Sequence, residues 1–253
     1  MIRRFLVIPT LCFFFAFAGY GQTNEETIFD EATIIYKKSV YAGLTLHTNG
    51  WGASLTFGKA KTAFKSRILQ FELVGMKHVK EVKSFNPYYD DSRSYIFGKL
   101  NTLTVFRPTY GMRHVKFDKI RKSGVSIGYN WRIGPSIGLV KPVYLEIGQP
   151  EIPPYQNIVV EKYDPERHTV DEIFGRASFL NGLDELRINP GIHGSFGLNF
   201  EYDPERSGLK GIEVGMNVDY YPLEEVEIMA FTDNYNLFIN FYVTLQFGKK
   251  FNK

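Results

Sequence analysis

A histidine and a serine two positions apart, His193 and Ser195, come nearest to a hydrolytic pair in this sequence. A serine nucleophile needs a base within hydrogen-bond reach and a third group that orients the base, and Glu201 lies further along the same face of a predicted strand. Side chains at positions i and i+2 of a strand lie roughly 7 Å apart, too far for direct contact. We therefore expect no enzyme, and a lipid-modifying acyl hydrolase is the weakest alternative.

Two neighbouring carboxylates, Asp90 and Asp91, suggest a calcium site at first sight. A calcium loop of the twelve-residue type places oxygen ligands at fixed spacings around such residues, and the surrounding sequence does not have this pattern. A solvated loop explains the pair better. The sequence thus predicts neither a metal nor a cofactor.

The first 21 residues have the pattern of a secretory signal peptide. Arg3 and Arg4 precede an apolar run over residues 5–18, and small residues at 19 and 21 lead to an expected cleavage before Gln22. A retained anchor is the alternative, but a membrane span needs about 20 apolar residues. We expect a signal peptide over 1–21 and a single domain over 22–253.

Cleavage removes the only cysteine, Cys12, and with it any disulfide or thiol chemistry. It also removes Arg3 and Arg4 from the 30 Lys and Arg residues and none of the 27 Asp and Glu residues, which leaves a formal net charge of +1. A nearly neutral chain has no strong positive electrostatic potential that would attract nucleic acid. We therefore expect no nucleic acid among its partners.

Period-two alternation of apolar and polar residues organises the rest of the chain. It is typical of strands with two different faces, and each segment is near the 9–11 residues with which a tilted strand crosses a bilayer. Asn49-Gly50 is a hairpin signal after the first segment. The alternating segments lie near 39–48, 51–58, 67–76, 94–107, 123–133, 191–202, 210–220 and 236–247.

Such alternation fits two kinds of protein. In a soluble sandwich or lipocalin-like barrel the apolar face points inward, whereas in a membrane barrel it contacts lipid. The polar positions are rich in Gly, Ser, Thr and Asn, aromatic residues lie near strand ends, and long connectors (77–93, 141–189, 221–234) alternate with shorter ones (59–66, 108–122, 203–208). These features predict an all-β fold, an eight-stranded antiparallel transmembrane β-barrel of the cell outer membrane.

Two segments, Leu-His-Thr-Asn-Gly-Trp-Gly at 46–52 and Gly-Pro-Ser-Ile-Gly-Leu-Val-Lys-Pro at 134–142, support a family likeness. With the signal peptide and the aromatic last strand, they resemble an uncharacterised family of small outer-membrane β-barrel proteins of Bacteroidota. The resemblance covers most of the mature chain and implies fold and location, but no activity. One departure is that six residues follow Phe247, where barrels of this class often end on an aromatic residue.

Strand parity also predicts a network of charged side chains in the barrel lumen. The interior of an eight-stranded barrel is just wide enough for side chains, and an unpaired buried charge is costly. We interpret the network as a structural plug, with a small-solute or ion path as the alternative. The predicted members, besides His193, are Glu72, Lys99, Arg107, Arg132, Glu201, Glu213 and Asp219.

The connector at 141–189 is the longest, and it contains a helix signal. Residues 169–172 match a capping box, and Ile173, Phe174 and Leu180 recur at helical spacing. We expect a short helix in this outer loop, whose apolar stripe is covered either by the barrel mouth or by a partner. The leading interpretation is a non-enzymatic structural or accessory subunit of an outer-membrane assembly, in contact with outer-membrane lipid and other outer-membrane proteins.

Overall fold

The computed structural model describes residues 36–90, 92–119, 124–151, 153–202 and 208–252. The predicted signal peptide at 1–21 lies outside these residues. Among the described residues, no helix is long and apolar enough to cross a membrane.

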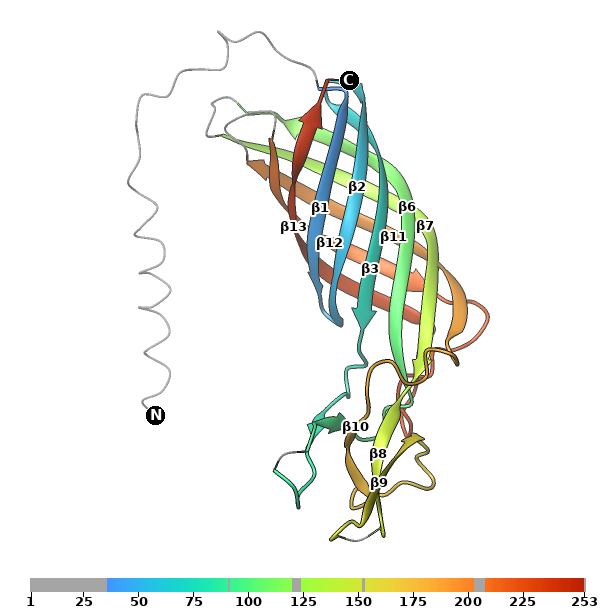
Figure 1. Cartoon of the computed structure of the whole chain (residues 1–253). Coiled ribbons are helices and arrows are strands. Elements are labelled where there is room, and N and C mark those ends of the chain that lie inside the picture. Colours follow the sequence, from blue (N-terminus) through green and yellow to red (C-terminus); the bar gives the residue numbers. More distant parts are fainter. Residues whose placement is uncertain (1–35, 91, 120–123, 152, 203–207, 253) are drawn as a thin grey trace, which may run out of the picture.

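Eight strands form a closed antiparallel barrel, in the order β1-β13-β12-β11-β7-β6-β3-β2 (Figure 1). Each barrel strand pairs with the barrel strands before and after it in the chain, and the pairing of β1 with β13 closes the cylinder. The predicted fold class is confirmed. The strands are β1 (Lys38–His47), β2 (Gly50–Thr62), β3 (Lys65–Met76), β6 (Asn101–Phe117), β7 (Val125–Pro142), β11 (Arg187–Tyr202), β12 (Gly208–Tyr220) and β13 (Leu237–Phe251).

Strand β6 differs most from the expectation, because it starts later and continues to Phe117 through residues assigned to a turn. Pro108 has no N–H to donate, and it lies in a gap of the β6–β7 register between Phe106 and Tyr110. The pairing with β3 continues across this gap as far as His114. A proline and a run of basic residues thus hid the second part of this strand, which pairing with β3 holds in place.

The barrel is apolar outside and polar inside. Leu46, Trp51 and Phe241 are 69%, 64% and 66% exposed, whereas Arg107 and Glu213 are fully buried. A soluble sandwich or lipocalin-like barrel would have the opposite arrangement. On β13 the outward apolar positions run from 237 to 247, which is about 33 Å along the strand. Because barrel strands are tilted by about 40° from the barrel axis, this length spans about 25 Å along the axis. This height matches the apolar band of a transmembrane barrel, about 25 Å.

A small sheet extends beyond the barrel at the end opposite the C-terminus (Figure 1). It consists of β8 (Tyr144–Gln149), β9 (Asn157–Lys162) and β10 (Ile173–Arg176), in the order β10-β8-β9. A two-stranded pair, β4 (Lys83–Ser84) and β5 (Tyr95–Ile96), belongs to the preceding connection. We call the three-stranded unit the outer sheet. Its buried core contains Tyr95, Leu145, Ile147, Tyr163 and Ile173.

The predicted short helix at 169–182 is wrong. The Thr169 hydroxyl donates to the Glu172 carboxylate at 2.8 Å, and the Glu172 N–H bonds the Thr169 carbonyl at 3.3 Å. This makes one turn, after which the chain enters β10 and pairs with β8. Short isolated helices are marginal in water, and Ile173 is completely buried in the core of the outer sheet. Tertiary packing therefore prevails over helical spacing.

Candidate functional site

Arg107 is the centre of one buried charge cluster in the lumen. Its Nη1 donates to Glu72 at 3.0 Å, and its Nε and Nη2 donate to the two Asp219 oxygens at 3.0 and 2.6 Å. Asp219 also accepts from the Ser136 hydroxyl at 2.8 Å, and its Oδ1 lies 2.9 Å from Nδ1 of His193. A bidentate arginine–carboxylate pair is among the strong charge-assisted interactions, and it links β6 to β12 across the barrel.

Glu213 is the centre of a second cluster, nearer the terminal end of the lumen. It accepts hydrogen bonds from Arg132 at 2.7 Å, from the Tyr242 hydroxyl at 2.6 Å, and from the side-chain amides of Asn130 and Gln246 at 2.8 and 2.6 Å. Four donors on one buried carboxylate offset much of its desolvation. The two clusters together cross-link β3, β6, β7, β12 and β13 through the barrel interior.

The seven predicted lumen residues therefore divide into three groups. Five of them form the two clusters just described. Lys99 lies outside the barrel strands, before β6, and pairs with Glu81 at 2.8 Å, so its assignment to the lumen is wrong. Glu201 belongs to the terminal end of β11, where it binds Lys250 and lies 4.0 Å from Lys119.

Arg113 is a lumen cation that was not predicted. Arg113 donates to Asn199 at 3.0 Å and to Gln246 at 2.8 Å, and its guanidinium lies 4.9 Å from the centre of the Tyr41 ring. The sequence signal was available, because inward parity on β6 continues from Arg107 through Thr109 to Arg113 once Pro108 is accepted inside the strand.

The histidine and serine of the hydrolytic pair contact different residues. His193 lies against Asp219, whereas the Ser195 hydroxyl accepts a hydrogen bond from Nε of Arg132 at 3.0 Å. A base bonded to the nucleophile is the minimum geometry for covalent catalysis. These two side chains instead take part in the two structural clusters.

Apolar side chains close the end of the lumen nearest the outer sheet. The β12–β13 connection folds into the mouth, where Leu100 and Asn101 donate backbone N–H groups to the Ile228 carbonyl at 3.0 and 3.3 Å. The Asn234 side chain accepts from the backbone N–H groups of Ile228 and Met229 and donates to the Met229 carbonyl. The buried cluster contains Val74, Met76, Leu103, Val105, Val140, Tyr221, Val226, Ile228, Met229 and Phe238.

The predicted partner surface does not form one face. Ile173 is buried, and Phe174 packs against the rings of Tyr89 and Tyr155, with centroids 5.6 and 6.4 Å away. Leu180 is 70% exposed but lies in a turn beyond β10. The β10 side of the outer sheet is covered, because the Asn86 side chain donates to the Ile173 carbonyl at 2.9 Å.

The opposite edge of the outer sheet, strand β9, is open. In the part of the chain that the structure describes, β9 pairs with β8 alone. The Tyr163 N–H bonds the Val143 carbonyl, so the alternate residues Glu161, Val159 and Asn157 direct their backbone groups toward β8. Ile158 and Val160, which lie between them, direct theirs away from β8. Ile158, Val159 and Val160 are 48%, 37% and 46% exposed. An apolar strand with a free edge and two exposed faces is a surface that proteins usually cover.

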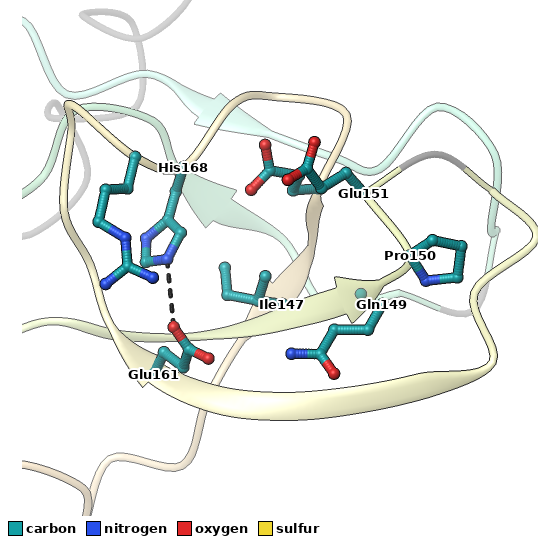
Figure 2. A pocket seen from close by; sticks show the side chains of 9 residues that line it. Ile147, Gln149, Pro150, Glu151, Glu161 and His168 are labelled. Carbon is teal, nitrogen blue, oxygen red and sulfur yellow. Dashed lines mark ion pairs between the residues drawn. The ribbon is translucent and has the colours of Figure 1, made fainter.

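A hollow of about 680 Å³, lined by both charged and apolar groups, adjoins β9 (Figure 2). Ile147 lies at its centre, and His168 faces Glu161 of β9, with Nε2 and Oε2 3.5 Å apart. Glu151 and Gln149 lie on the other side. The hollow mixes acidic and basic groups, and among the described residues no cluster of three or more His, Cys, Asp or Glu side chains is arranged to hold a metal ion.

Comparisons with known proteins give only distant likenesses. No protein-family profile and no curated protein matches the chain. The chain is similar to Ail, the attachment invasion locus protein of Yersinia pestis, solved in complex with the heparin analogue sucrose octasulfate, at 10% identity and a TM-score of 0.40, over 86% of this chain and 100% of that one. Neisserial surface protein A is 7% identical, with a TM-score of 0.34, over 85% of this chain and 96% of that one. Likenesses at this level carry no functional argument.

Proposed function

We propose that this protein is a non-enzymatic β-barrel of the outer membrane that serves as a docking subunit, and that its partner binds to the free edge of β9. The observation that carries the proposal is the exposed run Ile158-Val159-Val160 on an unpaired edge of the outer sheet. The proposed partner is a protein with an extended segment that adds a strand to this sheet. Main-chain hydrogen bonds give such a complex affinity, and alternate side chains give it specificity.

Membrane residence is supported by the outward apolar band. Exposed apolar patches beyond a few hundred Å² are normally covered by something, and here large apolar side chains point outward from all eight barrel strands. Lipid is the cover that reaches every side of a cylinder. The signal-peptide pattern at 1–21 is the address that export to the outer membrane requires.

The connections support an orientation with the outer sheet away from the cell. Three of the four connections at the outer-sheet end are long (77–100, 143–186 and 221–236) and the fourth is the turn at 48–49, whereas the connections at the terminal end span 63–64, 118–124 and 203–207. Barrels of this class have short periplasmic turns and longer extracellular loops. On this basis β9 faces the exterior, where a surface partner can reach it.

The closed lumen favours docking over the alternative function of a small-solute channel. A channel of this size would need a continuous polar gap between side chains. Here the Arg107 and Arg132 guanidinium groups each bridge the interior, and an apolar cluster fills the outer mouth.

A proline substitution on β9 tests the proposal. Val160→Pro removes an N–H that points away from β8, so the pairing with β8 remains while the ladder to a partner loses a donor. Val160→Thr keeps the N–H and the branched shape and is the matched control. Both variants should show the heat-dependent gel mobility of a folded barrel, and only the proline variant should lose the companion that co-purifies with wild type in mild detergent. Equal retention by both variants would exclude strand addition at this edge.

A further inference from the structure

We propose that a groove on the lipid-facing side of β1, β2 and β3, at the terminal end of the barrel, binds an anionic glycerophospholipid. The groove has a volume of about 350 Å³. The inference goes beyond partner docking and depends only on the membrane residence of the barrel. The side chains that carry the argument are Lys38, Lys59 and Arg67 at one end of the groove, and Val40, Phe57 and Leu69 at the other.

Three cations lie side by side on neighbouring strands. Lys38 is directly opposite Lys59 in the β1–β2 register, and Lys59 is directly opposite Arg67 in the β2–β3 register. All three side chains are exposed on the outer face. Like charges directly opposite each other destabilise a sheet, and within the described residues none of the three forms an ion pair. No ion pair among the described residues offsets this repulsion, whereas a bound anion would.

A row of apolar side chains lies next to the cations, on the side toward the membrane centre. Val40 is opposite Phe57, Phe57 is opposite Leu69, and Leu69 is opposite Tyr110. Each of the first three is two residues from a cation on its own strand, which is about 7 Å toward the membrane centre. A glycerophospholipid has the matching arrangement, with its phosphate at the membrane interface, level with the cations, and its acyl chains toward the membrane centre, level with the apolar row.

The combination of a cationic end and an apolar end favours an anionic phospholipid over inorganic phosphate and over a zwitterionic lipid. Inorganic phosphate would neutralise the cations but leave the apolar row without a contact. A zwitterionic lipid carries its own cation, which the row of basic side chains would repel. The anionic phospholipid is the ligand that satisfies both halves of the groove.

Two other exposed lysines at the terminal end of the barrel provide a matched control. Lys210 of β12 and Lys249 of β13 are exposed on the outer face at the same end of the barrel, opposite Phe247 and Val40 respectively, but outside the groove. If the attraction to anionic lipid were diffuse, Lys210 and Lys249 would contribute as much as Lys59 and Arg67. If the lipid binds in the groove, Lys210 and Lys249 would contribute little.

Lipid binding to purified full-length protein in detergent, followed by native mass spectrometry, tests the proposal. Dioleoyl phosphatidylglycerol should bind in competition with a large excess of inorganic phosphate and much more tightly than dioleoyl phosphatidylcholine. The variant with Lys59→Gln and Arg67→Gln should bind phosphatidylglycerol about 25-fold more weakly, since each basic residue near an anionic lipid contributes a factor of about five. The variant with Lys210→Gln and Lys249→Gln should bind like wild type.

Equal weakening in both double variants would replace the site by a diffuse basic rim. Displacement by phosphate, or equal binding of the two lipids, would also overturn the proposal. If the groove variant does not fold, phosphatidylglycerol with a photoreactive acyl chain gives the answer on wild type. Labels should gather on peptides containing Phe57 and Leu69, and an even distribution around the barrel would contradict the site. Loss of partner docking at β9, at the other end of the barrel, would leave these results unchanged.

Discussion

Removal of the Arg107 guanidinium is the perturbation that tests the closed lumen most sharply. Arg107→Met keeps much of the side-chain volume but deletes three charge-assisted hydrogen bonds, one to Glu72 and two to Asp219. It leaves two carboxylates in a buried environment, where loss of one partner of an ion pair costs 3–5 kcal/mol. Asp219 keeps its contacts with Ser136 and His193. We therefore expect a loss of about 3 kcal/mol in the free energy of unfolding, the lower end of that range.

The assay is reversible urea unfolding in lipid vesicles, followed by the fluorescence of the outward-facing Trp51 and Trp131. The control is a triple variant in which Arg107→Met is combined with Glu72→Gln and Asp219→Asn, since neutral amides cost less to bury than unpaired carboxylates. It should recover part of the lost stability. A loss of less than about 1 kcal/mol for Arg107→Met, the level of exposed ion pairs, would mean that water solvates these charges and that the lumen is not closed.

Three further predictions concern the membrane face, the lumen and the outer sheet. Val214→Arg on the lipid face should lower the free energy of unfolding by about 2–4 kcal/mol, whereas Asn217→Ser on the inner face should be much milder; equal effects in urea titrations would contradict the assignment of faces. Purified protein in planar bilayers should give no stable conductance, and steady currents that change with Arg132→Ala would instead support the channel. Hydrogen bonds from Lys162 and a tyrosine hydroxyl lower the pKa of Glu185, so the charged form is favoured in the folded state and the contact is present at neutral pH and lost as pH falls through the lowered pKa. An NMR titration should place the midpoint below the ordinary value of about 4.3, and Lys162→Gln should raise it.

The barrel could be predicted from sequence because each of its strands has its own period-two alternation of apolar and polar residues. Each strand must keep one face for lipid and one for the lumen, so alternation marks all eight strands, and parity alone places Arg107, Arg132 and Glu213 inside. The partners of these charges could not be predicted in the same way. The contact of Glu213 with Arg132 joins β12 to β7, which are not neighbours in the barrel, so it depends on the stagger of the strands, which alternation does not encode.

The outer sheet was missed because its strands are short and lack alternation. Ile158, Val159 and Val160 form a continuous apolar run, since β9 has two exposed faces rather than one. Their β-branched side chains favour a strand, and this signal could have found β9. The helical spacing of Ile173 and Phe174 was misleading, because two or three apolar residues fit either period and only the core of the outer sheet decides between them.

Site-specific photo-crosslinking from β9 in intact cells tests the central claim of partner docking most directly. A photoreactive amino acid at Ile158, and in a matched strain at the exposed Lys116 near the terminal end of the barrel, is activated by light and the adducts are mapped by mass spectrometry. Docking at β9 predicts an adduct with an extended segment of a different protein from position 158 and none with the same protein from position 116. Adducts with a second copy of this chain, or the same adducts from both positions, would contradict it.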